Sequence, residues 1–176
     1  PQPTTALVIG ASGAIGSALV EHYLQDQRHA QVIAVSRTPP DQTVARLTHY
    51  RCDYSQDSIA DITGRIEGHG SNVSRIAICT GTLHGEDYQP EKKLEQIDAL
   101  AMAHVFSVNT IVPALWLQAL APLLKRSSDA VLVALSARVG SIEDNRSGGW
   151  YSYRASKAAL NMVMKSAAIE YRRRAP

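Results

Sequence analysis

Short strand-like runs alternate with longer amphipathic stretches along this chain. The first, residues 6–9, is continuously apolar, as expected for a strand buried on both faces of a parallel sheet. Glycine-rich or polar segments bound the other runs. These runs predict four further strands, at residues 31–36, 49–53, 75–79 and 130–135.

The segments between the strands carry apolar residues at helical spacing. A helix is predicted over residues 13–25, where Ile15, Leu19 and Tyr23 recur on one face. Residues 95–126 predict one long helix or two in series, with a kink expected at Pro113 because proline lacks a backbone donor. The remaining helices are expected at residues 57–68 and 150–174.

The predicted order β-α-β-α-β-α-β-α-β-α indicates the fold class: α/β, a Rossmann-type doubly wound parallel sheet. Right-handed crossovers place helices on both faces, giving three α/β/α layers. We expect one domain over residues 1–176. The sequence stops where another strand is expected, so the last strands of this fold are not expected within it.

Bulk composition narrows the class of partner. The 176 residues are 45% hydrophobic and 19% charged, with a formal net charge of +2 and a pI near 8.7. Such a mild charge argues against nucleic acid, and we read the basic cluster at residues 172–174 as a solvated helix end. The longest apolar stretch, residues 111–124, contains Gln118 and two prolines, so no membrane span is expected.

Cysteine and histidine usage adds little chemistry. Cys52 and Cys79 each lie in a strand-like run, which favours reduced thiols and a cytoplasmic protein. The six histidines show no ligand spacing, so no metal site is expected. The chain opens on Pro1 without a signal-peptide pattern.

A glycine-rich turn, residues 10–16 (GASGAIG), follows the first strand directly. Its glycines allow a tight turn and close approach of a pyrophosphate, and the following helix offers free N–H groups. A tight strand-to-helix connection without a ligand would use similar residues. The position favours dinucleotide binding by six residues of the turn: Gly10, Ser12, Gly13, Ala14, Ile15 and Gly16.

The end of the second strand bears on cofactor choice. Rossmann proteins specific for NAD place an acid about 20 residues after the glycine loop, but Ser36 and Arg37 stand here. Arg37 is suited to neutralise a 2′-phosphate, with Ser36 donating a hydrogen bond. We therefore expect NADP(H) rather than NAD(H); the alternative is a surface arginine at a strand end.

The last predicted helix carries Tyr153 and Lys157, four residues apart and so on one face. A nearby cation lowers the pKa of a phenol, which can then exchange a proton with a carbonyl or alcohol oxygen while a nicotinamide exchanges hydride. The spacing alone occurs often on exposed helices. It gains weight from the glycine loop and from the motifs below.

Together these motifs resemble the short-chain dehydrogenase/reductase family over essentially the whole chain. Segments 135–142 (LSARVGSI) and 149–157 (GWYSYRASK) are most similar to the C-factor or cell–cell signalling subgroup, which is related to carbonyl reductases. The resemblance implies that Tyr153 is the general acid/base, that Lys157 binds the nicotinamide ribose and lowers the tyrosine pKa, and that Asn109 anchors a water relaying protons to Lys157. Ser136 is expected to hold the substrate oxygen. Asp53, Tyr54, Thr80 and Gly81 complete the expected cofactor site.

Several positions depart from the family pattern. Ile9 replaces a threonine, Ala14 a glycine, and residues 78–79 (IC) replace two asparagines. The usual pair of serines after the fifth strand is Ser136–Ala137, and the second of the pair is usually catalytic. Three alternatives therefore remain: Ser136 holds the substrate oxygen, Ser141 holds it, or this contact is weak.

The expected function is NADP(H)-dependent hydride transfer to or from a small-molecule carbonyl or secondary alcohol. One alternative is a nucleotide-binding signalling protein with little turnover; another is an epimerase or dehydratase of the extended branch of the family. Relatives continue through further strands that close the nicotinamide pocket, so we expect residues 1–176 alone to turn over poorly. A homodimer or homotetramer is expected through the two long helices, where residues 115, 116, 117 and 120 are apolar around the helix.

Overall fold

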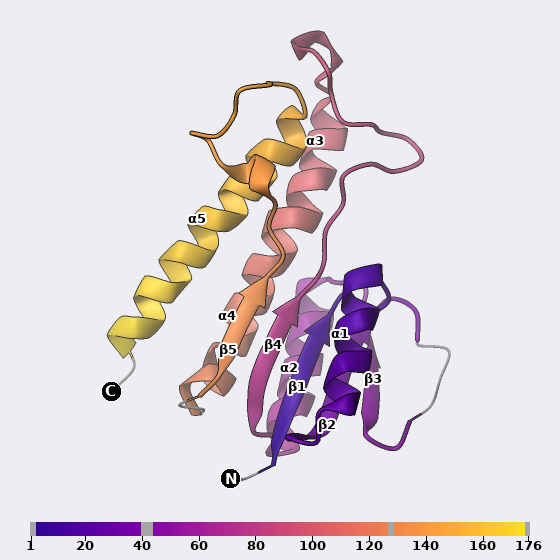
Figure 1. The fold of residues 1–176 in the computed structure, drawn as a ribbon, viewed down its shortest axis with the longest axis vertical. Helices are drawn as coiled ribbons and strands as arrows, with labels where there is room; N and C mark the ends of the chain where they lie inside the picture. Colours follow the sequence, from indigo (N-terminus) through magenta and orange to yellow (C-terminus); the bar gives the residue numbers. More distant parts are fainter. Residues whose placement is uncertain (1–2, 40–43, 127–128, 175–176) are drawn as a thin grey trace. The chain divides into compact units, whose positions relative to one another are not determined.

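The computed structural model describes residues 3–39, 44–126 and 129–174 (Figure 1). The chain divides into two compact units. The first unit comprises Pro1–Cys79 and Leu115–Ala134, and the second comprises Thr80–Ala114 and Leu135–Pro176.

A parallel five-stranded sheet forms the centre of the first unit. Its spatial order is β3-β2-β1-β4-β5. The apolar side chains of residues 6–9 are completely buried, as the continuous apolar run predicted. All five strands lie within two residues of their predicted positions: β1 Thr4–Ile9, β2 His29–Ser36, β3 Leu47–Arg51, β4 Val73–Ile78 and β5 Val131–Ala134.

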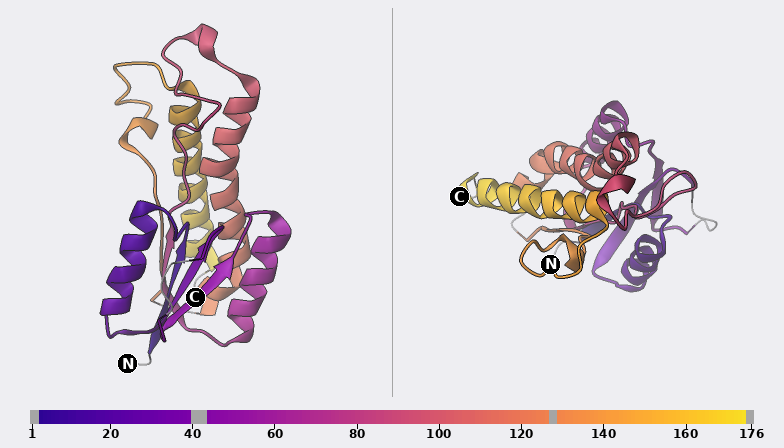
Figure 2. Two further views of the ribbon diagram at one scale, coloured as in Figure 1. Left: turned by 90° about the vertical axis from the view of Figure 1, so that its right-hand side faces the viewer. Right: turned by 90° about the horizontal axis from the view of Figure 1, so that it is seen from above.

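Helices cover both faces of this sheet. Helix α1 (Ala14–Gln25) lies on one face, and α2 (Gln56–Gly68) lies on the other with the part of α4 (Val112–Arg126) that belongs to the first unit (Figure 2). Helix α2 buries Ile59, Ile62 and Ile66 at the predicted spacing. The three-layer Rossmann architecture is therefore confirmed.

The strict alternation of strands and helices is wrong at one connection. Between β2 and β3 the described residues, 37–39 and 44–46, form no helix. Pro39 has no backbone N–H and clashes with a preceding helical turn, so helix formation is disfavoured there.

The apolar surplus on α4 has a different explanation from an oligomer interface. Trp116 and Leu120 are completely buried, and Leu117 is 5% exposed. These side chains are already buried within the chain, so they give no support to a dimer interface. The helical stretch Ala99–Lys125 is long and apolar enough by composition to cross a membrane, but a core helix passes the same test.

The second unit is built on α3 (Ala99–Phe106) and α5 (Tyr151–Arg174), which lie side by side (Figure 1). The segment predicted as one long helix or two in series, residues 95–126, forms two helices in series. It comprises the 3-10 turn Leu94–Gln96, then α3, the π turn Ser107–Ile111 and α4. A second 3-10 turn, Arg138–Gly140, precedes α5.

Candidate active site

The glycine loop of the first unit has the backbone geometry of a phosphate-binding turn. Gly10 adopts a φ of 82°, a region that disfavours other residues. A Cβ at Gly16 would stand 2.2 Å from the Gly10 carbonyl oxygen, so only glycine fits there. The loop and the helix pack as closely as dinucleotide binding requires.

The start of α1 remains open to a ligand. Gly13 is the residue before the helix and provides no side-chain cap for its first-turn N–H groups. Ser12 and Ala14 are exposed, and Ile15 is 57% exposed despite its apolar side chain. Free donors beside an uncovered apolar side chain are suited to the pyrophosphate and adjoining sugar of a dinucleotide.

Ser36, at the carboxyl end of β2, makes hydrogen bonds within the protein that the sequence did not predict. This serine is buried, and its hydroxyl donates to the Thr38 carbonyl oxygen at 2.5 Å while pairing with His49 Nε2 at 2.9 Å. Because its proton is already engaged, Ser36 supports the strand end rather than presenting a donor to a phosphate. Arg37 follows the end of β2 and is exposed.

Asp53 and Tyr54 follow β3 in the first unit. Asp53 is exposed and accepts hydrogen bonds from the Ser55 backbone N–H and hydroxyl, which lower the pKa of its carboxyl. Tyr54 adopts a φ of 67°, and burial raises the pKa of its phenol to about 12. The positive charge of Arg37 lowers the same pKa and so opposes the effect of burial, which indicates that Arg37 lies near Tyr54.

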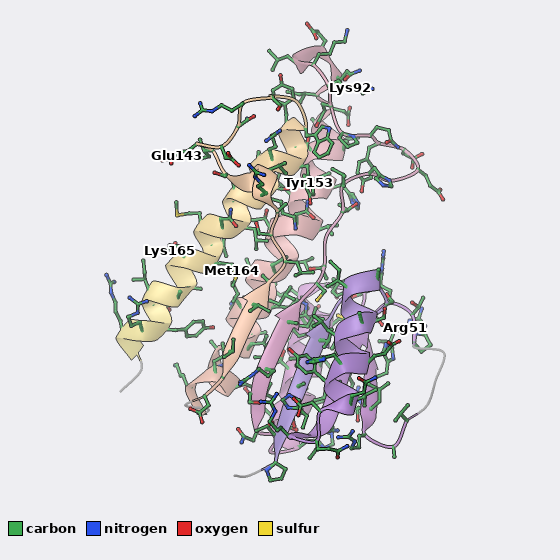
Figure 3. The ribbon with its side chains drawn as sticks, in the orientation of Figure 1. Arg51, Lys92, Glu143, Tyr153, Met164 and Lys165 are labelled. Carbon is green, nitrogen blue, oxygen red and sulfur yellow. The ribbon has the colours of Figure 1, made fainter. Side chains whose placement is uncertain are left out.

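Tyr153 (Figure 3) and Lys157 both lie on α5 in the second unit. Lys157 is only 3% exposed, and its Nζ lies 5.8 Å from the centre of the Tyr153 ring. The ammonium donates to the Leu135 carbonyl oxygen at 2.8 Å. A buried cation therefore stands beside a half-buried phenol, the pair that acid/base chemistry on a carbonyl requires.

The expected lowering of the tyrosine pKa is not found in this arrangement. Burial raises the pKa of the Tyr153 phenol, and burial lowers the pKa of the Lys157 ammonium. The ammonium hydrogen-bonds Leu135 rather than the phenol oxygen, so its stabilisation of a phenolate does not overcome desolvation.

Asn109 is completely buried in the π turn, and its amide is fully used. Its Oδ1 accepts from the Thr82 N–H at 2.7 Å, and its Nδ2 donates to the Thr82 carbonyl and the Ser156 hydroxyl. Ser156 in turn donates to the Tyr153 carbonyl oxygen at 2.8 Å. A Cβ at Gly81 would lie 3.4 Å from Lys157 Nζ, so the segment after β4 passes close to the lysine.

Pro113 removes one α-helical hydrogen bond at Asn109. In an α-helix the carbonyl of residue 109 would accept from the N–H of residue 113, but proline has none. The helix widens to a π turn at Ser107–Ile111, which ends two residues before this proline. The sequence predicted a kink at this proline. In the structure the missing N–H is accommodated by a π turn instead.

The two candidate serines have other partners. Ser136 is exposed and donates to Asn161 Oδ1 at 2.6 Å, and Ser141 accepts from the Asp144 N–H at 3.3 Å. Ala137, at the family's usual catalytic serine position, has no hydroxyl. Both serines remain alternatives for holding a substrate oxygen.

Sequence reasoning missed several buried polar residues of the second unit. Ser156 stands directly before Lys157 in the tyrosine–lysine motif, and that position is the signal that would have found it. Glu91 and Ser152, discussed below, gave no local signal because they pair across 61 positions. Thr80, by contrast, was among the predicted cofactor residues; it is buried, and its hydroxyl has no partner among the described residues.

Fold and site together define a dinucleotide-binding α/β protein with a tyrosine–lysine pair. The family described as short chain dehydrogenase matches residues 4–175. The chain therefore belongs to the short-chain dehydrogenase family of oxidoreductases.

Similar proteins place it within that family. The 1-hydroxy-2-glutathionyl-2-methyl-3-butene dehydrogenase of Rhodococcus sp. (strain AD45) is 30% identical over 162 residues, covering 91% of this chain and 68% of that protein. C-signal of Myxococcus xanthus is 35% identical over 79 residues, covering 45% of this chain and 48% of that protein. The NADPH-bound carbonyl reductase from chicken fatty liver is 26% identical with a TM-score of 0.84, covering 98% of this chain and 72% of that one.

Proposed function

We propose that this protein transfers hydride between NADP(H) and a small-molecule carbonyl or secondary alcohol, with Tyr153 as general acid/base. The observation that carries the proposal is the buried Lys157 ammonium beside the half-buried Tyr153 phenol, in a frame fixed by Asn109 and Ser156. The family supports oxidoreductase chemistry, and the chicken reductase of similar fold binds NADPH.

The residues present fit a nicotinamide dinucleotide. Gly16 lets α1 pack against the Gly10 carbonyl, where a Cβ would clash, and the uncapped start of α1 offers N–H donors to the pyrophosphate. Arg37 would contact the 2′-phosphate, and Asp53 the adenine. Lys157 would donate to the nicotinamide ribose hydroxyls. When bound, the nicotinamide supplies or accepts the hydride.

The chain's own residues manage the proton. In carbonyl reduction, the Tyr153 hydroxyl donates its proton to the carbonyl oxygen as the carbon receives hydride. Lys157 then stabilises the resulting phenolate. Asn109 would anchor a water that returns a proton through Lys157.

The proposed roles predict a pH dependence. Because burial raises the pKa of Tyr153, the phenol stays protonated at neutral pH and is ready to act as an acid. We expect kcat for carbonyl reduction to be flat from about pH 6 to 9 and to fall at higher pH, where tyrosine ordinarily ionises near 10. Alcohol oxidation needs the phenolate, so its kcat is expected to rise over the same alkaline range. Steady-state rates in both directions test this; a reduction rate that rises with pH would contradict it.

Cofactor choice is tested by titrating NADPH and NADH separately and following the fluorescence of the reduced nicotinamide. We expect tighter binding of NADPH. Arg37→Ala should weaken NADPH binding about 10-fold to 100-fold and leave NADH binding within about twofold, because only NADPH carries the 2′-phosphate. Arg172→Ala, which removes an exposed arginine near the end of α5, is the matched control. Equal losses for both cofactors would argue against the role of Arg37.

A second candidate function is a nucleotide-binding signalling protein with little turnover. Ala137 favours it, because the family's usual catalytic hydroxyl is missing there. The similarity to C-signal also favours it. Tyr153→Phe separates the two candidates. If the protein acts as an enzyme, the variant loses the biological effect but still binds the cofactor. If it acts by binding alone, the variant keeps the biological effect.

A further inference from the structure

Glu91 is a buried acid of the second unit with no role in the proposed chemistry. It lies in the segment between β4 and α3 and is only 6% exposed. Its carboxylate accepts from the Ser152 backbone N–H at 3.2 Å and also from the Ser152 hydroxyl. Its backbone oxygen accepts from the Trp150 N–H at 2.5 Å. One residue therefore holds the start of α5 by both its side chain and its backbone.

The start of α5 needs such a partner because its own sequence provides no cap. Trp150 stands before the first helical residue with a φ of 52° and has no side-chain oxygen to accept from the first-turn N–H groups. The first turn also contains no acidic residue to complement the helix dipole. Glu91 provides both functions from a distant segment of the chain.

The backbone beside Glu91 packs closely against the residues before α5. Gly149 precedes Trp150 with a φ of 64°, and a Cβ there would lie 3.2 Å from the Glu91 carbonyl oxygen. Figure 3 shows Lys92, the residue after Glu91, near the amino-terminal end of α5. Glycine thus lets the two backbones approach closely enough for the Trp150–Glu91 hydrogen bond.

Tyr153 directly follows the residue that Glu91 holds. Glu91, Ser152 and Tyr153 line one small pocket, whose apolar wall includes Leu83 and Val105. We propose that Glu91 is a positioning residue, which fixes the first turn of α5 and thereby aims the Tyr153 phenol at the reacting carbonyl. This inference rests on the proposed function of Tyr153.

The test compares Glu91→Ala, Glu91→Gln and Ser152→Ala, assayed for carbonyl reduction and NADPH binding. A misplacement of about 1 Å can cost on the order of 100-fold in rate, so Glu91→Ala is expected to lower kcat about 30-fold. KM for the carbonyl and Kd for NADPH should change less than about threefold. Glu91→Gln keeps an acceptor for Ser152 and loses only charge, so it should recover kcat to within about fivefold of wild type.

Glu95→Gln is the matched control, since Glu95 is an exposed acid in the neighbouring 3-10 turn. It should leave kcat unchanged. Should Glu91→Ala fail to fold, Glu91→Gln and Ser152→Ala carry the test, each lowering kcat by about twofold to fivefold at constant KM. The proposal is overturned if all variants that fold keep wild-type kcat. It is also overturned if kcat falls while KM rises and cofactor affinity weakens, without recovery in Glu91→Gln. If Tyr153→Phe itself retains activity, the proposed function fails instead.

Discussion

Tyr153→Phe is expected to lower kcat for carbonyl reduction about 1000-fold, equivalent to about 4 kcal/mol of transition-state stabilisation. The substitution removes only the phenol oxygen, the atom proposed to pass the proton. The ring keeps its place beside the Lys157 ammonium, and Ser156 still donates to the backbone carbonyl of residue 153. Affinity for NADPH should therefore stay within about twofold. Steady-state kinetics and a fluorescence titration of the same preparation measure both quantities.

Tyr151→Phe is the matched control for this experiment. Tyr151 is half-buried on the same helix, two residues earlier, and has no proposed chemical role. It should change kcat by less than about twofold. A Tyr153→Phe enzyme with wild-type turnover would remove Tyr153 from the chemistry.

Lys157→Met is expected to lower kcat about 100-fold to 1000-fold and to weaken NADPH binding about 10-fold. The substitution removes the cation that stabilises the phenolate and the donor to the nicotinamide ribose. Both kcat and Kd therefore change, whereas Tyr153→Phe changes kcat alone. This difference between the two variants is the distinguishing result.

Folding should survive the substitution at Lys157. Burial lowers the pKa of Lys157, so a buried ammonium is costly there and methionine removes that cost. Methionine also leaves the Leu135 carbonyl without its donor. These effects oppose each other, so the free energy of unfolding should change by no more than about 1 kcal/mol. Lys165→Met, an exposed lysine on the same helix (Figure 3), is the control and should leave kcat and Kd unchanged. Wild-type NADPH affinity in Lys157→Met would contradict the ribose contact.

Local patterns predicted the sheet well because they have local causes. The run at residues 6–9 is apolar at every position, as burial on both faces requires, and it forms the centre of β1. The connection from β2 to β3 was harder, since the topology expects a crossover helix while Pro39 opposes one. Trp116 and Leu120 looked like interface residues because a sequence does not reveal how much of a helix its own core buries.

The site was predicted where its residues lie close in sequence. The glycines of residues 10–16 and the Tyr153–Lys157 pair follow from turn and helix geometry. Glu91 could not be found this way, because its partner Ser152 is distant in sequence. The raised pKa of Tyr153 could not be predicted from the sequence either. It depends on the burial of the phenol and on the hydrogen bond from Lys157 to the Leu135 carbonyl.

The most direct test of the proposed chemistry follows the hydride itself. NADPH carrying deuterium at the transferred position of nicotinamide C4 is incubated with the protein and a panel of aldehydes and ketones, and the alcohols are analysed by mass spectrometry. Direct transfer predicts deuterium on the carbinol carbon of the product, with formation of that product abolished in Tyr153→Phe. Alcohol without deuterium, or labelled alcohol formed equally well by Tyr153→Phe, would contradict the proposal.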